Sequence, residues 1–185
     1  MPIVTFYRGH PNPPKTTMPA RLGANAIIIC QGKLLLEKRS DCDIWGLVGG
    51  GVKKHEEPIQ AITREIKEEL GLQISPDRFR KLAVYGEPGR IAAYQDGSVW
   101  RMVVVVFELM LSEIPDLVIS RESKELRFFS KEEVRELPIV VTYVARVSDS
   151  KSAPSTASRS SSSPAVSSGP MGVLDTPTTS PASMA

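Results

Sequence analysis

The alternation of apolar and polar positions predicts a single domain built mainly from strands. Two apolar runs, residues 24–30 and 33–39, are separated only by Gln31 and Gly32, which is typical of a β-hairpin whose Gly supplies a positive φ angle. A third run, residues 99–111, is apolar over nearly its whole length and predicts a long strand at the centre of a sheet. Shorter strands are expected at residues 45–48, 81–87, 90–95 and 125–129.

One amphipathic helix interrupts these strands. Pro58 suits the first helical position and Gly71 suits the cap just past the end, so these two residues set its limits. Its apolar residues recur every three or four positions and form one stripe that must face the core. The stripe consists of Ile59, Ile62, Ile66 and Leu70.

A second, short helix is expected near the end of the domain. Ser130 and Glu133 have the spacing of a capping box, so residues 131–137 should form this helix, and Pro138 should stop it. The pattern leaves open whether residues 138–147 continue as strand or helix.

Composition changes at both ends of the chain. Residues 8–19 are rich in Pro and polar side chains, so residues 1–20 are predicted to form an extended arm. Residues 148–185 are mostly Ser, Thr, Pro and Ala, and a segment with so few large apolar side chains cannot offset its ordering entropy by burial. We expect a disordered tail there; a regulatory Ser-rich tail and an unrelated extension are alternatives. The ordered domain is expected at residues 21–147.

Charge and cysteine content restrict the partners and the compartment. The 185-residue chain has 23 basic and 21 acidic residues, and a formal charge of +2 gives too weak a field for non-specific binding of a nucleic-acid polymer. Cys30 and Cys42 match neither a disulfide framework nor a metal-ligand spacing. No apolar run has the length of a membrane helix, and the N-terminus has no signal-peptide core. We therefore expect a reduced, cytoplasmic protein without a membrane partner.

The candidate chemistry lies on the amphipathic helix. Glu65 and Glu69 are one turn apart beside the apolar stripe, and Glu68 is next to them. Like charges at this spacing repel, and Arg64 is the cation on this helix that can pair with Glu68. A group of carboxylates suits a hard divalent cation such as Mg²⁺ or Mn²⁺, whereas a solvated acidic face is the alternative.

Three glycines precede this helix. Gly49, Gly50 and Gly51 are expected to form a loop whose exposed backbone can approach a bound group closely. A phosphate chain beside a metal site could bind to such a loop. The glycines are therefore candidate substrate-binding residues.

From Gly50 to Leu72 the chain resembles the signature of the Nudix hydrolases, G-x5-E-x7-R-E-U-x-E-E-x-G-U, in which U is aliphatic. Every fixed position is filled, by Gly50, Glu56 and the run REIKEELGL at residues 64–72. The resemblance covers roughly residues 21–140. It implies an α/β fold, an α/β/α sandwich around a mixed sheet, and a hydrolase that cleaves a nucleoside diphosphate linked to another group. Val48 departs from the family, whose members commonly have Pro there.

The resemblance also implies roles for the signature residues. Glu65 and Glu69 would bind the Mg²⁺ or Mn²⁺ cofactor, with help from Glu68. Glu56 would orient this set or touch a second ion. Arg64 would hold a glutamate in place rather than touch the substrate.

The general base and the substrate lie outside the signature. In many relatives a Glu on a distant loop activates the attacking water, and Glu125 and Glu122 are the candidates here. Pro88 follows Leu72 by 16 positions and resembles a marker of ADP-ribose pyrophosphatases, which favours ADP-ribose or a related nucleotide sugar. The alternatives are a MutT-like nucleoside triphosphate pyrophosphohydrolase and a non-catalytic nucleotide-binding module. The sequence does not decide whether the protein forms a homodimer.

Deleting residues 148–185 should leave the melting temperature and any hydrolytic activity nearly unchanged, because a segment with few apolar side chains contributes little burial. The measurement is a pair of melting curves and rate assays on the full and the truncated chain. Loss of folding on truncation would contradict the disordered-tail interpretation.

Overall fold

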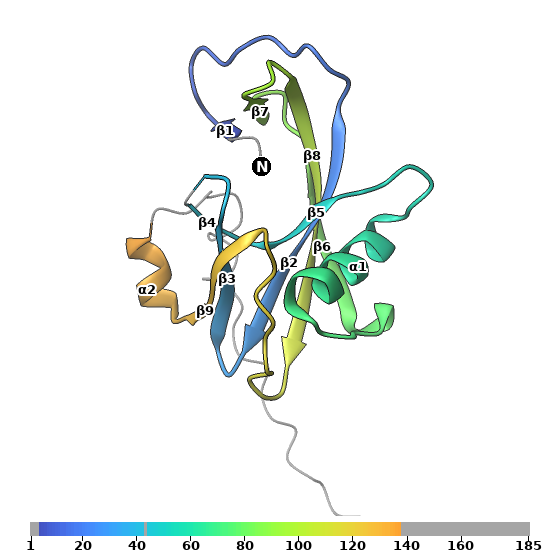
Figure 1. Ribbon diagram of the computed structural model, residues 1–185, viewed down its shortest axis with the longest axis vertical. Coiled ribbons are helices and arrows are strands. Elements are labelled where there is room, and N and C mark those ends of the chain that lie inside the picture. The colour runs from blue at the N-terminus through green and yellow to red at the C-terminus, as the bar shows by residue number, and fades with distance from the viewer. Residues whose placement is uncertain (1–3, 43, 138–185) are drawn as a thin grey trace, which may run out of the picture. The chain divides into compact units, whose positions relative to one another are not determined.

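The computed structural model describes residues 4–42 and 44–137 of the chain. The predicted disordered tail and the segment 138–147 lie outside the described residues. Within these ranges the chain forms one nine-stranded mixed sheet with two α-helices (Figure 1). Its strands are β1 (Val4–Tyr7), β2 (Arg21–Cys30), β3 (Lys33–Arg39), β4 (Trp45–Gly46), β5 (Val48–Gly51), β6 (Phe79–Tyr85), β7 (Ile91–Tyr94), β8 (Val99–Leu111) and β9 (Ser123–Phe129).

The centre of the sheet is the parallel pair β2 and β8. The strand order is β1-β7-β8-β2-β3-β4, and β5, β6 and β9 pair with β2, β8 and β3. The long apolar run predicted at residues 99–111 is β8, and its central position is confirmed. The predicted hairpin is also present, and its turn has positive φ at both Gln31 (48°) and Gly32 (73°).

The helices cover opposite faces of the sheet, so the predicted α/β/α sandwich is confirmed (Figure 1). Helix α1 (Pro58–Leu70) packs on one face, and the short helix α2 (Lys131–Glu136) contributes Val134 to the core on the other. A single 3₁₀ turn, Pro76–Arg78, follows α1. The α1 side chains that are fully buried are Ala61, Ile62, Ile66 and Leu70.

The limits of α1 agree with the sequence signals. Pro58 is the first helical residue, and the side-chain oxygen of Gln60 accepts a hydrogen bond from the backbone N–H of Glu57 at 2.8 Å. At the other end Gly71 has a φ of 74°, and its N–H donates to the carbonyl of Lys67. Only Gly adopts this left-handed conformation without a Cβ penalty, so the helix ends here.

The glycine triplet corrects one expectation. Gly49, Gly50 and Gly51 do not form a loop, because they belong to β5 and pair antiparallel with β2. Val48, where the family commonly has Pro, pairs with Ala26 in this ladder and is fully buried. A non-proline residue therefore fits this position as an ordinary core strand residue.

The predicted N-terminal arm also differs in part. Residues 4–7 form β1, which pairs with β7. Strand β7 pairs in turn with residues 99–101 at the start of β8. Residues 4–7 are β-branched or aromatic and suit a strand, but their partners lie 84 to 90 positions further along the chain, from Tyr7 opposite Ile91 to Val4 opposite Tyr94. Pairing to a distant strand is decided by tertiary contacts rather than by local propensity.

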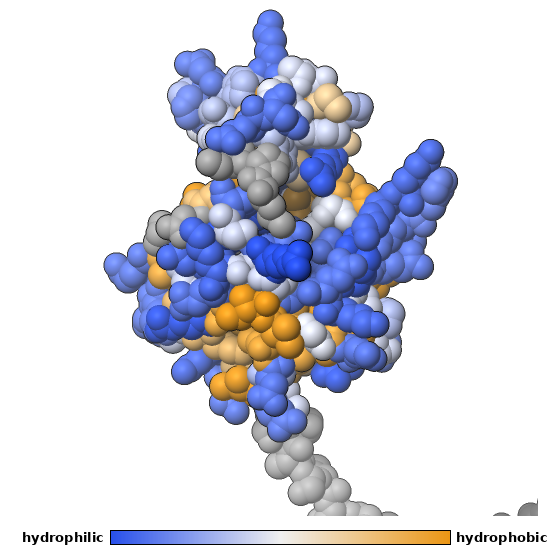
Figure 2. Space-filling model, in the orientation of Figure 1, coloured by the Kyte–Doolittle hydropathy of each residue, from blue (hydrophilic) through white to orange (hydrophobic). Residues whose placement is uncertain are grey.

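The segment between β8 and β9 exposes several apolar side chains. Ile114, Val118 and Ile119 lie between β8 and β9 and are more than half exposed. Figure 2 shows apolar residues gathered over this segment in the lower half of the view. Neither α1 nor α2, the α-helices of the described ranges, is long and apolar enough to cross a membrane. Both cysteines are free.

Candidate active site

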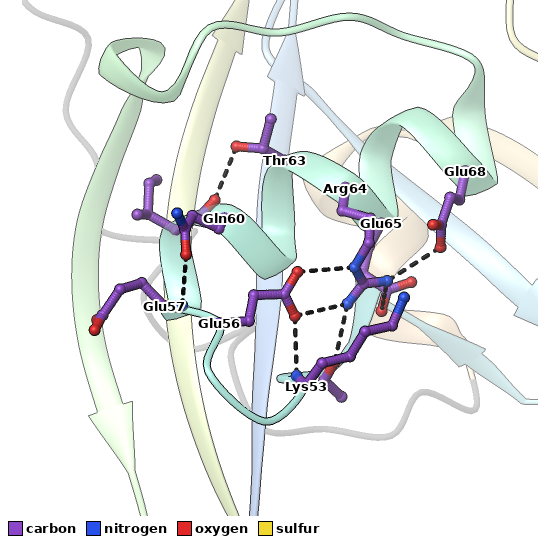
Figure 3. Close-up of polar contacts among 10 residues, drawn as sticks. Lys53, Glu56, Glu57, Gln60, Thr63, Arg64, Glu65 and Glu68 are labelled. Atoms are coloured by element: carbon purple, nitrogen blue, oxygen red, sulfur yellow. Dashed lines mark hydrogen bonds and ion pairs between the residues drawn. The ribbon is translucent and has the colours of Figure 1, made fainter.

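Arg64 holds the signature residues of α1 together (Figure 3). Its Nε and Nη2 donate to the two carboxylate oxygens of Glu56 at 2.9 and 3.1 Å, and Nη1 donates to Glu65 at 2.8 Å and to Glu68 at 3.1 Å. Nη2 also donates to the backbone carbonyl of Gly51 at 3.1 Å. One guanidinium thus links the helix to β5 and to the loop before the helix.

Glu56 is an ionised anchor. Hydrogen bonds from Arg64 and from the backbone N–H of Lys53 lower the pKa of Glu56 to about 2. A carboxylate held in this way stays charged at any physiological pH. Glu56 therefore positions Arg64 and the loop before α1, and its two oxygens are already committed to protein donors.

Glu65 lies against the bare backbone of β5. Its carboxylate occupies the space that a side chain at Gly50 would need, and a Cβ placed there would collide with both carboxylate oxygens. Burial raises the pKa of Glu65, with added repulsion from Glu68 and Glu122, although Arg64 acts in the opposite direction. The carboxylate is therefore more weakly stabilised as an anion than Glu56.

Glu69 is the most deeply buried of the signature glutamates, with 5% of the residue exposed. Its Oε2 accepts a hydrogen bond from the backbone N–H of Gly49 at 3.1 Å. Burial, followed by repulsion from Glu37 and Glu65, raises the pKa of Glu69 to about 9. Burial and the neighbouring carboxylates therefore favour the protonated form of Glu69 when no cation is bound.

Glu37 is a second buried carboxyl group, which the sequence pattern did not indicate. It lies in β3, is 1% exposed, and accepts a hydrogen bond from the hydroxyl of Ser123 at 2.9 Å. Its Oε2 is buried and has no hydrogen-bond partner among the described residues. Burial raises the pKa of Glu37 as well. The only signal in the sequence was a charged residue within the apolar run LLLEKR, which also fits an exposed strand position.

The predicted metal ligands are brought together only in part. In residues 4–42 and 44–137 no group of three or more His, Cys, Asp or Glu side chains is arranged to hold a metal ion. Arg64 binds Glu65 and Glu68, whereas Glu69 is turned to Gly49. The donor chemistry nevertheless fits a hard divalent cation, because buried carboxylates that repel one another are stabilised as anions by such an ion.

A cavity of about 240 Å³ lies next to these carboxylates. The backbone of Gly49, Gly50 and Gly51 forms part of its wall, and the Glu65 carboxylate packs against Gly50. The rest of the lining combines aromatic, polar and cationic side chains. Those that bear on the chemistry are Phe6, Arg21, Asn25, Arg39, Arg90, Tyr94 and Glu122.

The two candidates for the general base are clearly separated. Glu122 lines the cavity and repels Glu37, Glu65 and Glu69. Glu125 is an exposed residue of β9 opposite Lys38 and is not part of the cavity lining. The geometry therefore favours Glu122.

Comparison with known proteins identifies the family. The family model for the NUDIX domain matches residues 19–147. The match covers most of the chain, so the chain belongs to the Nudix hydrolase family. A Mycobacterium tuberculosis protein named "Putative 8-oxo-dGTP diphosphatase 3" is 35% identical over 112 residues, which are 60% of this chain and 49% of that protein. The chain thus spans about half the length of this relative.

Solved structures agree with this assignment. A MutT NUDIX hydrolase from Burkholderia pseudomallei has a TM-score of 0.54 and 27% identity, over 72% of this chain and 99% of that chain. The NUDIX domain of Shewanella oneidensis NrtR, solved with ADP ribose, has a TM-score of 0.57 at 18% identity, over 75% and 90% of the two chains. At that identity the second similarity supports the fold alone.

The raised pKa of Glu69 predicts a pH-dependent stability in the absence of divalent cations. Glu69 has a pKa of about 9 in the folded protein, whereas an unperturbed Glu has a pKa of 4.5. Between these two values the folded state binds more protons, so the free energy of unfolding should fall as the pH rises. Melting temperatures measured with a chelator from acid to alkaline pH should decline.

Glu69→Gln is the matched variant for this test. Glutamine cannot ionise but keeps the size of glutamate, so the decline with pH should be shallower and the variant should be the more stable protein at alkaline pH. Parallel melting profiles for the two proteins would show that Glu69 does not titrate as the structure indicates.

Proposed function

We propose that this chain hydrolyses the phosphoanhydride bond of a nucleoside diphosphate derivative with the help of Mg²⁺ or Mn²⁺. The observation that supports this most directly is the arrangement around β5. The bare glycine backbone both lines the cavity and contacts the Glu65 carboxylate of α1. A diphosphate that lies along Gly49–Gly51 would therefore meet the Arg21 guanidinium beside Gly51 and lie at the strand that contacts the Glu65 carboxylate.

The cavity contains groups that suit a nucleotide. The guanidinium of Arg21 lies near Gly51 and over the ring of Trp100, where it can attract phosphate oxygens. Phe6 and Tyr94 offer aromatic surface to a base. Arg39 and Arg90 also line the cavity, and each is paired with a neighbouring carboxylate, Asp41 and Glu87 respectively.

The proposed roles follow from these positions. Glu65 and Glu69 would hold the divalent cation, with Glu68 nearby and exposed for a further contact. When bound, the cation would neutralise the diphosphate and make an attacking water more acidic. Glu122 would accept the proton of that water, and Arg64 with Glu56 would keep the carboxylates in position.

Two observations point to different substrates. Pro88 lies in the turn between β6 and β7 that leads to Arg90 at the cavity, which favours the ADP-ribose-type substrate expected from the sequence. The name of the Mycobacterium tuberculosis relative favours a nucleoside triphosphate instead. The shared chemistry is a nucleoside diphosphate with a further group attached.

Products should separate these substrates. ADP-ribose should give AMP and ribose 5-phosphate, because attack within the diphosphate leaves one phosphate on each half. Chromatography of a nucleotide panel with Mg²⁺ or Mn²⁺ measures both this reaction and the cleavage of triphosphates to monophosphate and pyrophosphate. Rapid triphosphate cleavage with ADP-ribose untouched would favour the MutT-like activity.

Glu69→Gln separates an enzyme from a binding module. Loss of a carboxylate from the proposed cation site should nearly abolish turnover while the fold persists, and Mg²⁺ should raise the melting temperature of the wild type more than that of the variant. The test pairs rate assays with melting curves in the presence and absence of Mg²⁺. Equal rates, or equal shifts with Mg²⁺, would contradict the catalytic assignment.

The general base can be tested with two glutamates close in sequence. Glu122→Gln should lower kcat by about 10²- to 10⁴-fold, the usual contribution of a general base. Glu125→Gln is the matched control and should retain activity near that of the wild type, because Glu125 lies outside the cavity lining. A loss confined to Glu125→Gln would reverse the assignment.

A further inference from the structure

Glu37 lies on the sheet face that α1 covers. In β3 successive side chains point to opposite faces, and Leu34 and Leu36 belong to the core on the α2 side. Leu35 belongs to the core under α1. Glu37 therefore points toward α1, the helix that carries Glu69.

The environment of Glu37 is costly for a carboxylate. Ser123 satisfies Oε1, but Oε2 is buried and has no hydrogen-bond partner among the described residues. Removing a carboxylate from water without a full set of partners costs several kcal/mol, and an apolar residue of similar size avoids that cost. Stability of the core alone therefore does not explain a carboxylate at this position.

The neighbours of Glu37 increase this cost. Glu69 is itself buried, and Glu37 is the strongest charged contributor to the destabilisation of its anion. Glu122 and Asp41 also repel the Glu37 carboxylate. Arg39 attracts Glu37 but donates two hydrogen bonds to Asp41, at 2.9 and 2.6 Å.

Arg64, the cation of the signature, does not donate a hydrogen bond to Oε2 of Glu37. Its guanidinium donors go to Glu56, Glu65, Glu68 and the carbonyl of Gly51. Glu37 of β3 and Glu69 of α1 are thus two buried carboxyl groups that repel each other, and each has one oxygen fixed by a protein donor, Ser123 and Gly49 respectively.

We propose that Glu37 is a residue of the divalent-cation site, where its Oε2 binds the cation together with Glu69. Ser123 fixes the orientation of the carboxylate through Oε1. Glu37 lies outside the signature at residues 50–72 and comes from a different element. The inference rests on the proposed function, since it needs a divalent cation at Glu69.

Binding of Mn²⁺ alone tests this proposal without an activity assay. The full chain, freed of metal with a chelator and then exchanged into buffer, is titrated with Mn²⁺, and free Mn²⁺ is followed by its electron paramagnetic resonance signal. Glu37→Gln should weaken Mn²⁺ binding by about tenfold or more, the range seen when a residue supporting a metal is lost. Glu69→Gln should weaken it as well, and Glu132→Gln, an exposed glutamate of α2, is the matched control with unchanged affinity.

Each outcome decides the proposal. If Glu37→Gln binds Mn²⁺ like the wild type while Glu69→Gln does not, Glu37 is only a buried structural acid and the proposed function stands. If the wild type itself does not bind Mn²⁺, the cation site falls and this inference falls with it.

Ser123→Ala covers the case in which Glu37→Gln fails to fold, as judged by circular dichroism. It keeps the carboxylate but removes the hydroxyl that orients it, so Mn²⁺ binding should weaken several-fold. Unchanged binding in a folded Ser123→Ala protein would then overturn the proposal.

Discussion

The site depends on the hydrogen bonds that the Arg64 guanidinium donates. Its hydrogen bonds to Glu56, Glu65, Glu68 and the carbonyl of Gly51 join the helix, the preceding loop and the glycine strand. A planar guanidinium can satisfy several carboxylates in fixed directions, which the point charge of a lysine cannot do. The spacing of the acidic residues on α1 would otherwise be repulsive, so Arg64 makes this helix compatible with the fold.

Environment divides chemically identical side chains into two groups. Glu56 receives strong hydrogen bonds and has a pKa of about 2, so it is a permanent anion. Glu37, Glu65 and Glu69 are buried together, and burial raises the pKa of each. The first kind of carboxylate positions its neighbours, whereas a divalent cation would stabilise the second kind as anions, in addition to the hydrogen bond that Arg64 already donates to Glu65. The signature of residues 50–72 therefore contains both a scaffold and an unsatisfied electrostatic site.

The sequence predicted what local spacing decides. The caps of α1 and the placement of Glu65 and Glu69 beside the apolar stripe follow from helical periodicity, and so does the pairing of Arg64 with Glu68. Long-range pairing decided the rest. Glu37 meets Ser123 across 86 positions, and the choice between Glu122 and Glu125 depends on the register of β9 against β3. Neither relation leaves a periodic pattern in the chain.

The glycines of β5 allow close packing against both β2 and α1. At Gly49, φ is 140° and a Cβ would collide with the carbonyl oxygen of Ala24, so β5 could not pair so closely with β2. At Gly50 a Cβ would occupy the place of the Glu65 carboxylate. A side chain at Gly49 would therefore push β5 away from β2, and one at Gly50 would displace the Glu65 carboxylate. Gly49, Gly50 and Gly51 can line the cavity and lie against the helix carboxylate only because they have no side chains.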